Sequence, residues 1–341
     1  MLVRSTNLSQ KSFEYPTDWG QGSRGCWSGG GQRAENGASA DHTYYITIST
    51  PANALLFGST INDLWRCAGT SGRGRGLISG GTVHNTPTNA SNKMWYVTIA
   101  TPSAATAFGD LVTDRINPGA ASNGTRALIM AGWGTHNQIA TGKTSIDYVT
   151  IATTGAATNF GNLSHGTKRS SMVLTNTATG NGTYAMIMCD LLNYSSSWSS
   201  AKYDYIAIAT GTGSIIFGGM GPQVRGDGIT ANSNGTRSIW SGGYTGSWHT
   251  YMEYLTWSTL GNALAYGRMQ YNITGGSGVE DGSRGVIGGG TPGGNSSRSC
   301  FYFSMDLAPG TAVITSNFGE LTGSGYSDPG SQRKCTASYA G

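Results

Sequence analysis

Two short motifs recur along the whole chain, and this repetition constrains the fold more than any other feature. The first motif is a Tyr-Ile/Val-Thr-Ile run, followed by a small-residue turn and an aromatic-Gly pair. Its tyrosines are Tyr45, Tyr96, Tyr148, Tyr205, Tyr254 and Tyr302. The aromatic residues of the pair are Phe57, Phe108, Phe160, Phe217, Tyr266 and Phe318, at intervals of 51, 52, 57, 49 and 52 residues. A constant period of this length predicts a repeat protein in which each unit packs on its neighbours.

The second motif keeps the same period. It reads Asn-Gly-Thr-Arg in its fullest form, followed by a short apolar run and a pair of glycines. Its marker positions are Arg24, Arg75, Arg126, Tyr184, Arg237 and Arg284, at intervals of 51, 51, 58, 53 and 47 residues. Two independent markers with one period make a chance origin of the repeat untenable.

Each unit contains four short strand candidates, which we call a to d. Strand b is the apolar run before the glycines, and strand c is the Tyr-Val-Thr-Ile run, rich in β-branched and aromatic residues. We expect strand d to end at the aromatic-Gly pair and strand a to precede the Asn-Gly turn, as in residues 115–121. Four strands in a repeat of this length are typical of a β-propeller blade.

The two ends of the chain complement each other. Residues 333–341 resemble the strand a segment 65–72, and the strand b that should follow stands instead at residues 22–30. We therefore predict an all-β fold: a single closed β-propeller of six four-stranded blades spanning residues 22–341, with both ends in one blade and residues 1–21 as an N-terminal arm. A seventh blade is the alternative if residues 1–21 form further strands.

Composition agrees with a packed chain rich in turns. Gly makes up 54 of 341 residues and charged residues only 11%, but 9 Trp, 17 Tyr and 8 Phe argue against disorder. The net charge is only +4 and the sequence contains no run of basic residues, so no nucleic-acid-binding surface is expected. We expect no signal peptide and no membrane insertion. The five cysteines show no paired spacing and are expected to be small buried residues rather than disulfides.

The glycine pair after an apolar strand, followed by a Tyr-bearing strand and a further aromatic, resembles kelch-type repeats and the galactose-oxidase central domain. Kelch units usually carry a Trp on strand d, where this chain has an aromatic-Gly pair. The sequence pattern of the repeats looks more like that of propeller proteins encoded by tailed bacteriophages. This resemblance implies a virion or tail-associated protein, made in the host cytoplasm and located in the virion.

In a propeller the a–b and c–d turns share one face, and the b–c loops and d–a crossovers share the other. The small turn residues gather on the first face, whereas histidines and aromatic residues gather on the second. We expect any specific contact to use the second face. The candidate binding residues are His84, Trp133, His136, Tyr194, Trp198, Tyr244, Trp248 and His249. The alternative is that these rings only pack onto their own loops.

Catalytic and metal chemistry find little support in the sequence. No Cys-x-x-Cys, His-x-x-x-His or His-Glu-x-x-His spacing occurs, so no metal ion, other cofactor or catalytic residue is expected. The repeated arginines occupy one structural position and are better explained by a repeated hydrogen bond than by an anion site.

These features favour a non-enzymatic structural or adhesive virion protein of a bacteriophage, belonging to a tail, a fibre or the capsid. Its partners would be other virion structural proteins, with a host surface glycan or receptor as a second partner. A carbohydrate-binding adhesin that contacts host glycans directly is the alternative. A copper-dependent sugar oxidase or a glycosidase is less favoured.

Overall fold

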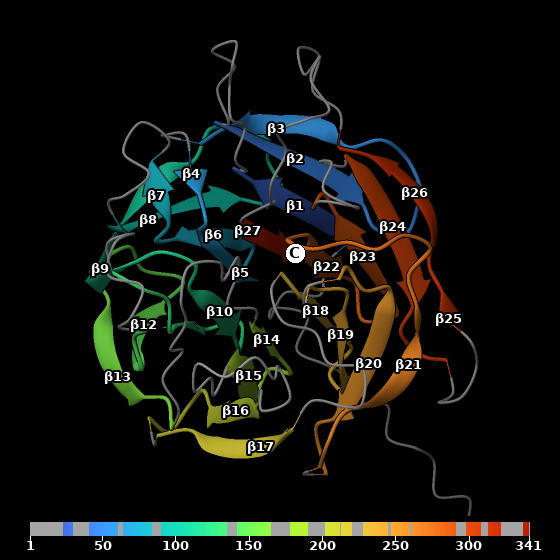
Figure 1. The fold of residues 1–341 in the computed structure, drawn as a ribbon. Helices are drawn as coiled ribbons and strands as arrows, with labels where there is room; N and C mark the ends of the chain where they lie inside the picture. The colour runs from blue at the N-terminus through green and yellow to red at the C-terminus, as the bar shows by residue number, and fades with distance from the viewer. Residues whose placement is uncertain are drawn as a thin grey trace, which may run out of the picture.

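The computed structural model is a ring of six β-sheets around a central axis (Figure 1). Each sheet is one blade with four antiparallel strands in the order a, b, c, d from the axis outward. The described part of the chain contains strands and turns but no helix. The predicted fold, a six-bladed propeller with four strands per blade, is confirmed. The structure describes residues 23–29, 41–60, 64–83, 90–134, 142–164, 178–189, 202–211, 213–219, 228–244, 247–259, 261–290, 298–307, 313–321 and 337–340.

The strands of each blade are named here from strand a to strand d. Blade 1 consists of β27 (Ala337–Ala340), β1 (Arg24–Ser28), β2 (His42–Thr47) and β3 (Leu55–Ser59). Blade 2 consists of β5 (Ala68–Gly72), β6 (Arg75–Ser79), β8 (Ser91–Thr98) and β9 (Thr106–Arg115). Blade 3 consists of β10 (Gly119–Ser122), β11 (Arg126–Met130), β12 (Ser145–Thr150) and β13 (Thr158–Asn162). Blade 4 consists of β14 (Ala178–Gly180), β15 (Tyr184–Cys189), β16 (Lys202–Ala207) and β17 (Ile215–Gly219). Blade 5 consists of β18 (Thr230–Ser233), β19 (Arg237–Ser241), β20 (Tyr251–Thr256) and β21 (Leu264–Arg268). Blade 6 consists of β22 (Ser277–Glu280), β23 (Arg284–Gly288), β24 (Ser299–Ser304) and β26 (Ser316–Glu320).

Three short strands lie outside this scheme. β25 (Val313–Ile314) adds to the outer edge of blade 5 by parallel pairing with β21. β4 (Leu64–Trp65), in the crossover from blade 1 to blade 2, pairs with β7 (Thr82–Val83) in the b–c connection of blade 2.

Blade 1 is built from both ends of the chain, as the split motif predicted. β27 is its innermost strand and pairs antiparallel with β1 over the range from Gly25↔Ala340 to Ser28↔Ala337. β1 in turn pairs with β2. The ring is therefore closed by main-chain hydrogen bonds, which leaves no free sheet edge at the junction between the termini.

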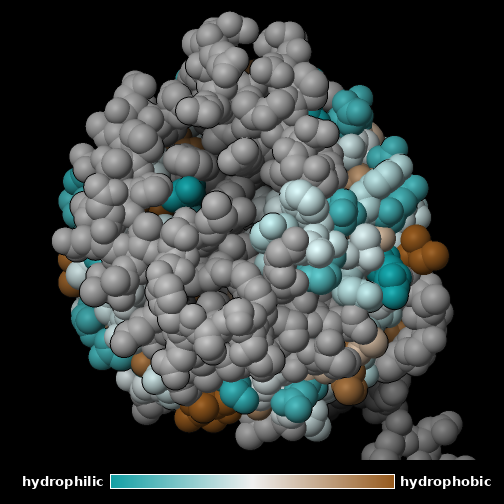
Figure 2. Space-filling model, viewed as in Figure 1, coloured by the Kyte–Doolittle hydropathy of each residue, from teal (hydrophilic) through white to brown (hydrophobic). Residues whose placement is uncertain are grey.

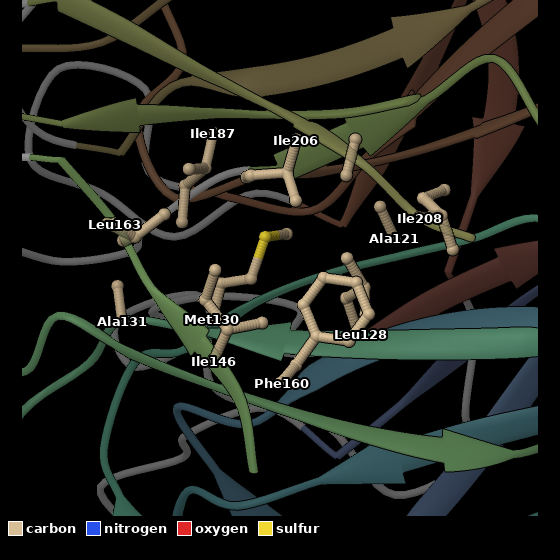
Figure 3. Packing of buried hydrophobic residues seen from close by; sticks show 11 residues of the cluster. Ala121, Leu128, Met130, Ala131, Ile146, Phe160, Leu163, Ile187, Ile206 and Ile208 are labelled. Atoms are coloured by element: carbon tan, nitrogen blue, oxygen red, sulfur yellow. The ribbon is translucent and has the colours of Figure 1, made fainter. Parts of the chain in front are cut away.

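The hydrophobic core lies between the blades. The strand d aromatics predicted to be buried there are all at most 8% exposed: Phe57, Phe108, Phe160, Phe217, Tyr266 and Phe318. Between blades 3 and 4, for example, Phe160 packs with Leu128 and Ile146 of its own blade and with Ile187 and Ile206 of the next (Figure 3). The repeat motif therefore encodes an inter-blade packing position.

In blades 1, 2, 4 and 6 the glycine after the strand d aromatic allows a close approach of the next blade. A side-chain carbon at Gly58 in β3 would collide with the carbonyl of Ser103 in the c–d turn of blade 2. That turn also donates a hydrogen bond from the Ala105 amide to the Ser59 carbonyl, at 2.8 Å. Glycine thus lets the turn of one blade approach the outer strand of the blade before it.

One predicted boundary is wrong. Residues 115–121 were expected to form a single strand a, but β9 continues to Arg115 and strand a of blade 3 begins only at Gly119. The extension of β9 pairs Arg115 with Ser91 of β8. A buried ion pair between Arg115 and Asp147 holds the end of β9 against blade 3, an interaction that local propensity does not reveal.

Three cysteines lie in the described core. Cys26, Cys67 and Cys300 are buried and free, as expected for small apolar residues. Burial raises the pKa of the Cys26 thiol to about 12, so it is protonated at neutral pH. Cys335 and the side chain of Cys189 lie outside the described residues.

Candidate functional site

The b–c connections leave their blades through a common backbone device. In blades 2, 3 and 5 a main-chain hydrogen bond closes the base of the connection just before strand c. The three bonds run from the Ser91 amide to the Gly81 carbonyl at 2.8 Å, from Lys143 to Gly132 at 2.8 Å, and from His249 to Gly243 at 3.0 Å. The same loop base therefore carries different side chains in three blades, and these can be compared position by position.

In blade 5 this base carries two aromatic rings. Gly242 and Gly243, with φ of 76° and 103°, end strand b and turn the chain onto the face. Tyr244 and Trp248 then form an isolated antiparallel bridge, so that only three residues separate the paired positions. Their ring centroids lie 5.2 Å apart at an interplanar angle of 53°. Trp248 is 39% exposed, and Tyr244 is half-buried. This bridge places both rings side by side at the base of the b–c connection.

A second group of side chains follows Trp248 and lies at the start of β20. The ring of His249 lies 5.9 Å from that of Tyr251. The guanidinium of Arg268, the residue paired with Tyr251 across β20 and β21, lies 4.5 Å from the centroid of the Tyr251 ring. Arg268 is exposed, and no acidic partner for it occurs among the described residues. We call Tyr244, Trp248, His249, Tyr251 and Arg268 the blade 5 row.

Trp133 does not behave as the predicted binding residue. It occupies the position in blade 3 that Tyr244 occupies in blade 5, but it is only 5% exposed. Its main chain bridges Ile116 and Gly142, and the buried guanidinium of Arg66 lies 5.8 Å from its ring. Burial lowers the pKa of Arg66 to about 10, which leaves the side chain charged at neutral pH. Trp133 is therefore part of the packed structure, as the alternative interpretation held.

The other candidates divide between described and undescribed segments. Tyr244, Trp248 and His249 lie together in the blade 5 row, as the sequence placed them. His84, His136, Tyr194 and Trp198 lie outside the described residues. His42 is the first residue of β2, and its Nδ1 lies 2.9 Å from a carboxylate oxygen of Asp41.

Sequence reasoning missed Tyr251 and Arg268. Tyr251 stands three residues before the repeated tyrosine of strand c. The equivalent residues are His42, Lys93, Ser145, Lys202 and Ser299 in the other blades. An aromatic residue at this otherwise polar position was the available signal. Its pairing with Arg268 depends on the register of β20 and β21, which includes an irregularity between Met252 and Glu253.

The opposite face uses its repeated arginines to join the blades. Arg126 donates from Nη1 to the carbonyls of Ile208 and Ala209, in the c–d turn of blade 4, at 3.1 and 3.0 Å. Its guanidinium also lies 4.6 Å from the ring centroid of Tyr148. The same pair of hydrogen bonds to the next blade recurs at Arg24, Arg75 and Arg284, and Arg237 donates to one carbonyl, that of Leu307. The predicted structural role of these arginines is confirmed: they bind backbone carbonyls of the next blade.

Buried acids also join blades. Asp147 in β12 accepts hydrogen bonds from Arg115 Nη2 at 2.7 Å and from the Val112 amide at 3.0 Å. Asp204, at the equivalent position of β16, accepts hydrogen bonds from the hydroxyls of Ser164 and Ser214. Within the described ranges, no group of three or more His, Cys, Asp or Glu side chains could hold a metal ion.

Most of the described surface in Figure 2 is intermediate to hydrophilic. Over blades 5 and 6 this surface is white to teal, and the hydrophobic residues lie at the rim. In the part of the chain that the structure describes, no helix has the length and apolar character needed to cross a membrane.

Comparison with known proteins gives a fold and no family. No protein-family model matches the sequence, and no curated protein matches it. The solved structure of YjhT is similar, with a TM-score of 0.63 and 13% sequence identity over 89% of this chain and 98% of that chain. This likeness supports the six-bladed propeller fold.

Proposed function

We propose that this propeller is a non-enzymatic binding module whose b–c face contacts a partner, while its blades serve as a rigid frame. The observation that carries the proposal is the contrast between the two faces. The repeated charged residues of the a–b and c–d face are occupied by carbonyls of neighbouring blades. On the b–c face, Trp248 and Arg268 are exposed.

The rigidity of the frame supports this role. Binding is favoured when the contacting groups are already ordered, because less conformational entropy is lost on association. The blade 5 row stands on two glycines, a main-chain bridge and the end of β20. Two acids on strand c, Asp147 and Asp204, are fully buried and hydrogen-bonded between blades, a structural arrangement rather than a catalytic one.

The resemblance of the repeats to phage-encoded propellers gives the proposal its setting. We propose a virion subunit that docks on neighbouring virion proteins and presents the b–c face for attachment to the host. Antibodies raised against the purified propeller should then label intact virions of the phage that encodes it. Unlabelled virions whose disrupted components also lack the protein would contradict the virion assignment.

The choice of face is tested by adsorption of the purified protein to host cells. The double variant Tyr244→Ala/Trp248→Ala should reduce adsorption at least about tenfold, because truncating aromatic anchors removes a large share of the binding energy. The control places bulk and charge on the opposite face, with Thr125→Arg and Thr154→Arg at exposed turn positions. Loss of adsorption in the control, with full adsorption of the first variant, would show that the partner binds the turn face.

A further inference from the structure

The repeat supplies an internal control for Trp248. Ala90 in blade 2 and Gly142 in blade 3 stand at the same place, one residue before the amide that closes the loop base. The loop base therefore forms equally well with a methyl group or no side chain at this position. Closure of the loop base therefore does not require an exposed indole at this position, which favours a binding role for Trp248.

The geometry of the two rings defines what could bind. An angle of 53° between Tyr244 and Trp248 makes a corner rather than a stack. The C–H bonds on one face of a pyranose ring form a small apolar patch that packs on an aromatic ring, while the sugar hydroxyls point outward. An indole N–H and a phenol hydroxyl beside such a ring supply polar edges for those hydroxyls.

The surroundings favour a saccharide over a protein surface. Stable protein interfaces bury about 800 Å² per partner and have an apolar centre. The described residues that flank the two rings in sequence, Ser247, His249 and Thr250, are polar, and the exposed aliphatic Ile314 lies at the other end of the blade 5 row, paired with Arg268. Two rings with polar neighbours match one or two sugar units.

Arg268 adds charge selectivity. It lies at the far end of the blade 5 row and stacks on Tyr251, without an acidic partner among the described residues. Trp248 and Tyr251 are three positions apart along the chain, which corresponds to about 10 Å in an extended conformation, a distance that a disaccharide spans. A carboxylate on the second sugar would meet a guanidinium that can bind it in bidentate fashion.

We propose that the blade 5 row is a binding site for an acidic oligosaccharide: a pyranose ring packs in the corner between Trp248 and Tyr244, and Arg268 binds the carboxylate of a neighbouring sugar. This inference rests on the proposed binding role of the b–c face and names the class of ligand.

The experiment is a glycan array carrying matched neutral and uronic- or sialic-acid oligosaccharides, followed by calorimetric titration of the best-bound acidic compound and its neutral counterpart. We expect binding to acidic members. Trp248→Ala should weaken it at least about tenfold, whereas Trp248→Phe, which keeps an aromatic ring, should stay within about threefold. Arg268→Gln should lower affinity for the acidic compound about tenfold and leave the neutral one unchanged. Leu307→Ala, at an exposed position in the c–d turn of blade 6, is the control and should bind normally.

The outcomes separate this inference from the proposed function. An array without binding, combined with loss of cell adsorption in Trp248→Ala, would overturn the saccharide site while the b–c face remained the contact surface. Glycan binding that survives Trp248→Ala and Arg268→Gln would place the site elsewhere. Because Ala90 and Gly142 occupy the equivalent position, an unchanged Tm is expected for Trp248→Ala and excludes unfolding as the cause.

Discussion

Arg126 shows how a single repeated residue stabilises the contact between blades. Its guanidinium packs over Tyr148 in its own blade and donates to two carbonyls of blade 4. In blade 4 the marker position holds Tyr184 instead, whose ring stacks on Tyr205 at 4.2 Å. The position is therefore defined by its packing on the strand c tyrosine, and the hydrogen bonds to the next blade are added where the residue is arginine.

Arg126→Ala should destabilise the protein by about 2 kcal/mol, because two hydrogen bonds from a charged donor and a cation–π contact are lost at a partly buried site. Arg73→Gln is the control, since Arg73 is exposed and makes a single long contact to Thr125 Oγ1 at 3.3 Å. Its cost should stay below about 0.5 kcal/mol. Urea unfolding at pH 7 measures the stability of both variants. Equal stabilities would show that the contacts of Arg126 with blade 4 do not stabilise the protein.

Glu280 makes stability depend on pH. It lies on the innermost strand of blade 6 and accepts a hydrogen bond from Asn232 Nδ2 of blade 5 at 2.8 Å. Burial raises the pKa of this carboxyl to about 7 from its usual 4.5. The native state thus keeps a proton that the unfolded state has released, so the free energy of unfolding falls as pH rises from about 4.5 through 7.

Glu280→Gln removes this titration. The variant should match the parent protein near pH 4.5 and exceed its stability by about 1 kcal/mol at pH 8.5, a moderate gain because the side chain is half-buried. Glu320→Gln, at an exposed position of β26, is the matched control and should not change the pH profile. Parallel pH profiles for the parent and Glu280→Gln would contradict the assignment.

Strand d is the element that joins one blade to the next. In β9 the side chain of Phe108 is 3% exposed and packs with Leu77, Ala127 and Ile151, while Val112 on the same strand is 50% exposed. The exposed residues of the outer strands vary between blades from aliphatic to polar, as in Ile216 of β17 and Asn317 of β26. The inward aromatic and the glycine after it have a fixed character, whereas the outward residues do not.

Phe108→Ala should cost about 3–5 kcal/mol, since it leaves a cavity between blades 2 and 3. Val112→Ala on the same strand should cost less than about 0.5 kcal/mol, because Val112 is already half-exposed. Chemical denaturation of both variants tests the assignment of strand d, and a mild effect of Phe108→Ala would mean that the blades can close the gap.

At the scale of the whole molecule, closure depends on β27. This strand pairs with β1 and lies at the axis beside β5 and β22, the inner strands of the adjacent blades. Removing β27 exposes one edge of β1 and removes contacts that β5 and β22 make at the axis.

Deletion of residues 333–341 should therefore open or unfold the ring, seen as a lower Tm and a larger hydrodynamic radius. Addition of a synthetic peptide of residues 333–341 should restore part of the lost Tm, which distinguishes loss of the strand from general damage. A truncated protein that melts like the full chain would show that the ring does not need its closing strand.

The sequence by itself determined the architecture. The period of its motifs gave six units, the composition of each unit gave four strands, and the complementary ends placed the closure in one blade. Repetition makes this inference strong, because the sequence of each repeat independently indicates the same packing between neighbouring units. The buried aromatic of strand d and the structural role of the repeated arginines followed for the same reason.

Only the tertiary structure decided which loop residues are exposed. Trp133 and Tyr244 stand at the same place in their repeats, yet the crossover from blade 1 brings Arg66 over Trp133 and buries it, whereas Tyr244 pairs with an exposed Trp248. The pairing of Arg268 with Tyr251 likewise depends on register. Burial of a loop side chain is set by what other segments place against it, and this information is absent from the loop's own sequence.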